Sequence, residues 1–190
     1  MRILEIMRHA PTKKGPTRGR GSHLSAEGVA LARALGDRIG PISYVLTSAV
    51  PRAIETAVAM GFAVDDTVTV PAGYLPNQIE HHAQWTWSAP YARYAQWLGR
   101  SPELAAVAAE HRSHWLRAVL AVEDGETALV VSHGGIIEPT LVSCRPQDDL
   151  SAWGLPFSPC DGARLVFDEG AWQSVEFLRV KTPAPGDLAA

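Results

Sequence analysis

Two histidines in this chain follow apolar runs that predict buried β-strands. Arg8 and His9 come directly after the run at residues 3–7, and His133 follows the run at residues 126–132. In an open α/β sheet, ligands bind just beyond the carboxyl ends of the strands. A guanidinium and two imidazoles at such ends predict an anion site that contains a nucleophile or a base.

Arg52 adds a second guanidinium to this set. It follows Pro51, which starts a predicted helix over residues 51–60. A cation in the first helical turn opposes the helix dipole, unless an anion lies between the cation and the helix N-terminus. The planar fork of an arginine suits phosphate oxygens. The four side chains are therefore predicted to converge on one phosphate-sized anion.

The elements that must position these residues alternate between strands and helices, which predicts a three-layer α/β/α sandwich with a mostly parallel central sheet. Strands are expected at residues 3–7, 42–46, 68–70 and 126–132, with a closing hairpin or edge pair at 164–167 and 172–178. Helices are expected at residues 26–39 (after an N-cap at Ser25), 51–60, 91–98, 102–122 and 135–142. A single domain is expected over residues 1–180, followed by a loose C-terminal tail at 181–190.

Composition narrows the class of protein. The chain has 190 residues, 46% of them hydrophobic, and a net charge of −3, which argues against a general nucleic-acid binder. No run approaches the roughly 18 apolar residues of a membrane span, so no membrane partner is expected. Two cysteines and no signal-peptide pattern favour the reducing cytoplasm. The oligomeric state is open, with a homodimer as one option.

Four ordered blocks resemble the histidine phosphatase superfamily, also called phosphoglycerate mutase-like. Met7-Arg8-His9-Ala10 is similar to its Arg-His-Gly signature, with Ala10 in place of the glycine. The other blocks follow in order as Leu24-Ser25-x-x-Gly28, Thr47-Ser48-x-x-x-Arg52-Ala53-x-x-Thr56-Ala57 and Val131-Ser132-His133-Gly134-Gly135. The resemblance covers about residues 1–60 and 126–180.

This resemblance implies a phosphatase that hydrolyses small phosphomonoesters without a metal or other cofactor, through a phosphohistidine on His9. It implies that Arg8 and Arg52 clamp the phosphate and that His133 is a second histidine of the pocket. The hydroxyl of Thr12 and the backbone N–H of Gly134 are expected to contact the substrate.

The chain departs from the family at the general acid, which is often a glutamate after a leucine. Here Leu75-Pro76 is followed by Asn77, which carries no titrating proton. Glu80 is the first candidate for the acid, and a solvated loop carboxylate is the alternative interpretation. His81 or His82 could replace it.

Two other patterns have structural and functional interpretations. Five aromatic residues could wall the pocket or pack against the sheet: Trp85, Trp87, Tyr91, Tyr94 and Trp97. His111 and His114 have helical spacing that could chelate zinc, but without a third ligand they are interpreted as a surface face.

Three functions fit these features. The first is a phosphomonoesterase that acts through phosphohistidine. The second is a catalytically weakened phosphate-binding module, which Asn77 favours. The third is a sugar-phosphate mutase, which the short chain disfavours.

Overall fold

The six strands of this protein form one sheet with helices on both faces. The structure is a computed structural model, and it describes residues 1–15, 22–71 and 83–180. The elements are β1 Arg2–Arg8, α1 Ala26–Gly36, β2 Tyr44–Ser48, α2 Pro51–Ala59, β3 Asp66–Val68, α3 Pro90–Leu98, α4 Pro102–Leu120, β4 Thr127–Ser132, α5 Ile137–Cys144, β5 Gly162–Asp168 and β6 Ala171–Leu178. Short 3-10 helices occupy Ala83–Thr86 and Leu150–Trp153.

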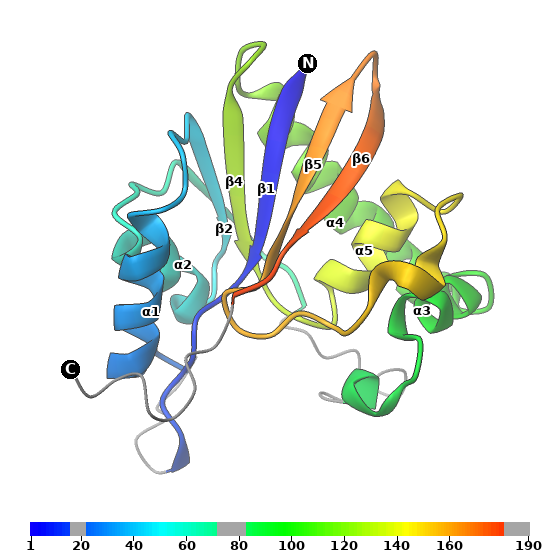
Figure 1. Cartoon of the computed structure of the whole chain (residues 1–190), viewed down its shortest axis with the longest axis horizontal. Coiled ribbons are helices and arrows are strands. Elements are labelled where there is room, and N and C mark those ends of the chain that lie inside the picture. The colour runs from blue at the N-terminus through cyan, green and yellow to red at the C-terminus, as the bar shows by residue number, and fades with distance from the viewer. Residues whose placement is uncertain (16–21, 72–82, 181–190) are drawn as a thin grey trace.

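The strand order across the sheet is β3-β2-β4-β1-β5-β6 (Figure 1). β1, β2, β3 and β4 run parallel, whereas β5 is antiparallel to both β1 and β6. The predicted mostly parallel sheet is confirmed, and so is the predicted pairing of the last two strands. The carboxyl ends of β1, β2 and β4 therefore lie side by side at one edge of the sheet.

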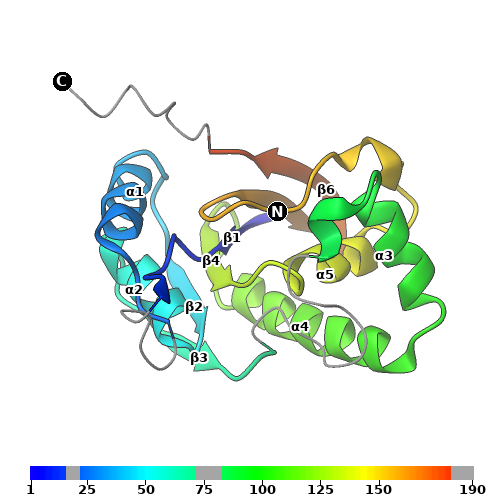
Figure 2. The same cartoon turned by 90° about the horizontal axis from the view of Figure 1, so that it is seen from below.

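Figure 2 shows α1 and α2 on one side of the sheet and α3, α4 and α5 on the other. An apolar core fills the space between the sheet and each group of helices. Leu4 and Ile6 of β1 belong to the core beneath α3, α4 and α5, together with the fully buried Trp115. Met7 belongs to the core beneath α1 and α2, with Ala53. Because side chains alternate along a strand, β1 supplies both layers. The predicted three-layer sandwich is confirmed.

An N-cap serine and first-turn prolines mark the beginnings of three helices, as the sequence predicts. The Ser25 hydroxyl caps α1 by accepting a hydrogen bond from Gly28 N at 3.0 Å. Pro51 and Pro102 occupy the first turns of α2 and α4, where a missing N–H leaves no bond unmade. None of the described helices is long and apolar enough to cross a membrane.

Several boundaries differ from the sequence-based expectation. Predicted strands at 42–46 and 68–70 lie instead at Tyr44–Ser48 and Asp66–Val68, because pairing between β2, β3 and β4 sets the strand limits rather than local hydrophobicity. Helix α1 ends at Gly36 instead of residue 39. A Cβ at Gly36 would lie only 2.0 Å from the Met60 carbonyl oxygen, so the chain passes α2 too closely there for any other residue.

The aromatic cluster packs mainly into the core rather than walling a pocket. Tyr91 and Tyr94 are fully buried, and Trp87 is 8% exposed with Arg93 stacked 4.5 Å from its ring centre. Trp97 packs against the same core, as the packing interpretation predicts. Only Trp85 of these five residues is substantially exposed. The pocket-wall interpretation is therefore wrong for the buried members of the cluster.

We expect Gly28→Ala to lower the free energy of unfolding by about 1–3 kcal/mol, which urea denaturation would measure. A Cβ at this position would lie 2.0 Å from the Pro11 carbonyl oxygen, so α1 and the segment after His9 would have to separate. Gly40→Ala is the matched control, because a Cβ there meets no atom within 4 Å. Equal stabilities of the two variants would contradict the prediction.

Candidate active site

Four predicted residues meet where β1, β2 and β4 end. Arg8 is the last residue of β1, His9 follows it, His133 follows β4, and Arg52 lies in the first turn of α2. The ring centres of His9 and His133 are 5.2 Å apart, and Arg52 Nε donates to His133 Nδ1 at 3.2 Å. The structure thus places all four residues in one cluster.

A backbone carbonyl sets the orientation of the His9 ring. His9 Nδ1 lies 2.8 Å from the Ala10 carbonyl oxygen. A carbonyl oxygen can only accept, so Nδ1 carries the hydrogen and donates it. In the neutral ring the lone pair is therefore on Nε2, which leaves this nitrogen able to act as a nucleophile or a base.

The Thr56 hydroxyl joins the turn after His9 to helix α2. It accepts a hydrogen bond from Ala10 N at 2.9 Å and donates one to the Arg52 carbonyl oxygen at 2.7 Å. The backbone next to His9 and the backbone of Arg52 are therefore bonded to the same fully buried oxygen atom.

His133 is held as a neutral imidazole between Arg52 and Ser48. Its Nδ1 accepts from Arg52, so Nε2 carries the hydrogen and donates it to Ser48 Oγ at 2.7 Å. Burial, together with the smaller effects of the charges of His9 and Arg52, lowers the pKa of His133 to about 2. The ring therefore adds no charge to the cluster at neutral pH.

The Arg8 guanidinium lies in a narrow slot beside the histidines. It is 8% exposed, and Nη1 donates to the Phe157 carbonyl oxygen. On its other side is Gly134, where a Cβ would lie 3.0 Å from Nη1 and 3.1 Å from Nε. Burial lowers the pKa of Arg8, and the charges of Glu138 and Asp161 oppose this shift.

Arg8 Nε is buried and has no hydrogen-bond partner among the described residues. A buried donor without a partner costs free energy. A phosphate oxygen would satisfy this donor, so Arg8 fits the predicted anion site.

The other predicted site residues have different outcomes. Gly134 lies against Arg8, while a contact between its N–H and a substrate stays a prediction. Thr12 pairs with Leu24 in an isolated bridge after β1, and its contact with phosphate also stays a prediction. Glu80 and its alternatives His81 and His82 lie outside the described residues, as does Asn77.

Sequence reasoning missed three polar residues around the cluster. Ser48 accepts a hydrogen bond from His133, and Glu138 accepts one from Gly135 N in the turn after His133. The third residue, His111, was expected on a surface face. Instead, His111 is 2% exposed, with Nε2 3.0 Å from Ser132 Oγ and Nδ1 3.1 Å from Thr140 Oγ1. The surface interpretation of His111 is wrong, because α5 and β4 cover this side of α4. The signal for Glu138 was a lone carboxylate within the apolar segment 136–144.

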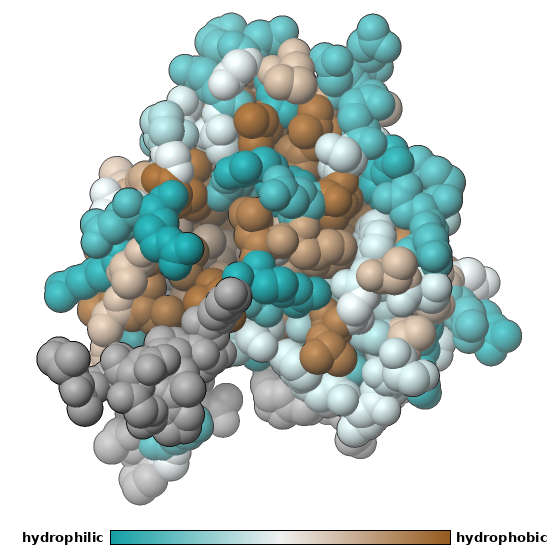
Figure 3. Space-filling view, viewed as in Figure 1, coloured by the Kyte–Doolittle hydropathy of each residue, from teal (hydrophilic) through white to brown (hydrophobic). Residues whose placement is uncertain are grey.

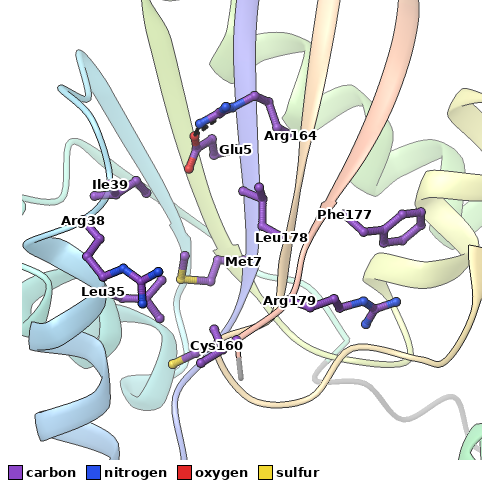
Figure 4. Close-up of a pocket in the computed structure, with 11 residues that line it drawn as sticks. Glu5, Met7, Leu35, Arg38, Ile39, Cys160, Arg164, Phe177, Leu178 and Arg179 are labelled. Carbon is purple, nitrogen blue, oxygen red and sulfur yellow. Dashed lines mark hydrogen bonds and ion pairs between the residues drawn. The ribbon is translucent and has the colours of Figure 1, made fainter. Parts of the chain in front are cut away.

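A separate cavity of about 550 Å³ lies on the side of the sheet that carries α1, between α1 and β6 (Figure 4). Its walls include the apolar side chains of Met7, Leu35, Ile39 and Leu178, and the Glu5–Arg164 ion pair crosses it. Figure 3 shows the same face, with hydrophobic surface crossed by hydrophilic atoms. None of the four clustered residues lines this cavity, so the candidate active site is at a different place.

Comparison with known proteins places the chain in a family. A model of the histidine phosphatase superfamily (branch 1) matches residues 4–179. The chain therefore belongs to the histidine phosphatase superfamily, as the four sequence blocks predict. No curated protein is similar enough in sequence to be matched to it.

Solved structures of other proteins share this fold. The phosphoserine phosphatase of Entamoeba histolytica, in complex with 3-phosphoglyceric acid, superposes with a TM-score of 0.67 at 16% identity, over 95% of this chain and 98% of that one. A mycobacterial glucosyl-3-phosphoglycerate phosphatase with bound VO3 gives 0.64 at 24% identity, over 95% and 100%. YhfR from Bacillus stearothermophilus gives 0.60 at 20% identity, over 90% and 94%.

We expect the free energy of unfolding to fall as the pH is lowered from 6.5 to 5, by up to about 2 kcal/mol for each neutral buried histidine. Burial lowers the pKa of His111 to about 3 and that of His133 to about 2. In this pH range the unfolded chain binds protons that the folded chain excludes, so stability rises with pH.

Urea denaturation at several pH values would measure this slope in the wild type and in His111→Gln. The variant should show a shallower slope, because one of the two excluded protons is gone. Circular dichroism would confirm that both proteins are folded at each pH. Identical slopes would contradict the expectation.

Proposed function

We propose that this protein is a metal-independent phosphomonoesterase that acts through a phosphohistidine intermediate on His9 Nε2. The observation that carries the proposal is the contact of His9 Nδ1 with the Ala10 carbonyl oxygen, which leaves Nε2 as the nucleophilic nitrogen. Membership of the histidine phosphatase superfamily supports the same assignment.

The reaction would proceed in two displacements at phosphorus. Nε2 of His9 attacks the phosphorus atom, the P–O bond to the alcohol breaks, and a phosphohistidine forms. Water then attacks the same phosphorus atom, the P–N bond breaks, and inorganic phosphate leaves. Phosphoryl transfer depends mainly on positioning and on stabilising charge on the equatorial oxygens.

The two arginines would supply this stabilisation. Arg8 has a buried Nε without a described partner, and Arg52 is held by the lone pair of His133. Fixed guanidinium groups in a partly buried site stabilise developing negative charge without having to reorganise. A neutral His133 holds Arg52 in place and adds no competing positive charge.

The alcohol that leaves in the first step needs a proton. Glu80 is the proposed donor, from the sequence pattern alone. The proposed substrates are small phosphate monoesters. The names of the two phosphatases above mention phosphoserine and glucosyl-3-phosphoglycerate, which makes both esters suitable members of a first substrate panel.

We expect the wild type to release phosphate from such a panel and His9→Ala to lose at least about 10³-fold of this activity, because the attacking nitrogen is gone. The panel would contain phosphoserine, 3-phosphoglycerate, glucosyl-3-phosphoglycerate and p-nitrophenyl phosphate. His114→Ala, in α4 and outside the four-residue cluster, is the control that removes a histidine elsewhere.

Full activity of His9→Ala would contradict the proposal. Loss of activity in EDTA that zinc restores would contradict it too. Well-folded wild type that releases no phosphate would favour the weakened phosphate-binding module. Transfer to a second acceptor rather than to water would favour a mutase.

We expect Glu80→Gln to lower kcat for esters of poor leaving groups, such as phosphoserine, by about 10²-fold, because the alcohol must then leave unprotonated. The rate for p-nitrophenyl phosphate should change much less, since nitrophenolate leaves without a proton. Comparing the two substrates in one variant is the measurement. An equal change for both would argue against Glu80 as the acid.

A further inference from the structure

Glu138 is a fully buried carboxylate to which the proposed reaction gives no role. It lies in the first turn of α5, and its side chain is 0% exposed. Burial raises its pKa, while hydrogen bonds from backbone N–H groups and the charge of Arg8 lower it. A carboxylate in such a place is costly unless it is paired and hydrogen-bonded.

The two oxygens of Glu138 accept hydrogen bonds from two different segments. Oε2 accepts from Gly135 N at 2.6 Å, in the turn that carries His133 and Gly134. Oε1 accepts from Phe157 N at 3.0 Å, in the segment that leads to β5. The carboxylate therefore ties these two segments together.

The same two segments form the walls of the slot that holds Arg8. One wall is Gly134, against which the guanidinium lies so closely that a Cβ there would be 3.0 Å from Nη1 and would displace the guanidinium. The other wall is Phe157, whose carbonyl oxygen accepts from Arg8 Nη1 while its N–H donates to Glu138. Moving either wall would move the guanidinium.

Arg52 is held by a separate set of contacts. Its Nε donates to His133, and its backbone carbonyl accepts from Thr56. Neither of these two bonds ends on Glu138, although His133 lies in the turn that Glu138 fixes through Gly135 N. Arg52 is therefore linked to Glu138 less directly than Arg8 is.

From these contacts we infer that Glu138 is a positioning residue, which sets the Arg8 guanidinium at the phosphate by fixing both walls of its slot. The inference rests on the proposed function, in which Arg8 binds the phosphoryl group. Glu138 is not a second candidate for the general acid. Both of its oxygens accept hydrogen bonds from backbone N–H groups. A proton on either oxygen would weaken one of these bonds.

The test compares Glu138→Gln with wild type for binding of inorganic phosphate by titration calorimetry and for kcat and KM. An amide nitrogen cannot accept from Gly135 N or Phe157 N, so one wall of the slot is released. We expect the Kd for phosphate to rise by about tenfold or more, since an error of about 1 Å in position can cost about 10²-fold in rate. Glu138→Asp keeps the charge but cannot reach both segments, and it serves as the milder variant if Glu138→Gln does not fold.

Glu5→Gln is the matched control. Glu5 is also a buried carboxylate, but it pairs with Arg164 at the cavity between α1 and β6. This variant should lose stability and keep its phosphate affinity. A rise in Kd of the same size in Glu5→Gln would overturn the inference, because the effect would then follow from general destabilisation.

A double-mutant cycle separates positioning from a merely structural role. Glu138→Gln combined with Arg8→Lys should weaken phosphate binding less than the product of the single effects, because both act through Arg8. Combined with Arg52→Lys, the departure from multiplicative effects should be smaller, because Arg52 is linked to Glu138 through His133 rather than through the slot of Arg8. Multiplicative effects in both cycles, or a wild type that does not bind phosphate, would overturn the inference. Phosphate binding that depends on Glu138 without ester hydrolysis would support it and contradict the proposed phosphatase.

Discussion

The parallel pairing of β1 with β4 sets where the candidate site lies. The register runs from Ile3 opposite Thr127 to Arg8 opposite Ser132, and the bond from His9 N to Ser132 O continues it one residue further. His9 and His133, which are 124 positions apart in the chain, therefore lie next to each other, each directly after the end of its strand. A shift of β4 by one residue would turn its side chains, and with them His133, to the opposite face. The placement of Arg52 follows from the same sheet, because β2 pairs with the other edge of β4.

Several groups that can carry positive charge lie close together at this end of the sheet. The fold reduces the repulsion between them in a different way for His133 and for Arg8. His133 stays neutral because it is buried next to Arg52. Arg8 remains close to the carboxylates of Glu138 and Asp161, which favour its charged form. The site therefore combines two guanidinium groups with imidazoles of defined tautomer. Such an arrangement favours an anion while it leaves a lone pair on His9 Nε2, which is what the proposed reaction requires.

The fold class and the four clustered residues could be predicted from the sequence, because both depend on local patterns. β1 and β4 end at or within one residue of the end of their apolar runs, so Arg8, His9 and His133 lie at or directly after the strand ends. His111 and Glu138 could not be placed in the same way. Their burial depends on elements brought together from distant parts of the chain, such as β4 and α5 over His111. Helical spacing predicts which residues share a face, but it does not predict what covers that face.

The Thr56 hydroxyl has a mechanical consequence. One oxygen atom bonds both to the peptide N–H next to His9 and to the backbone carbonyl of Arg52. A displacement of α2 relative to the sheet would therefore move the backbone next to His9 and the backbone of Arg52 together. The backbone next to the proposed nucleophile and the backbone of the proposed phosphate clamp are thus coupled through a single oxygen atom.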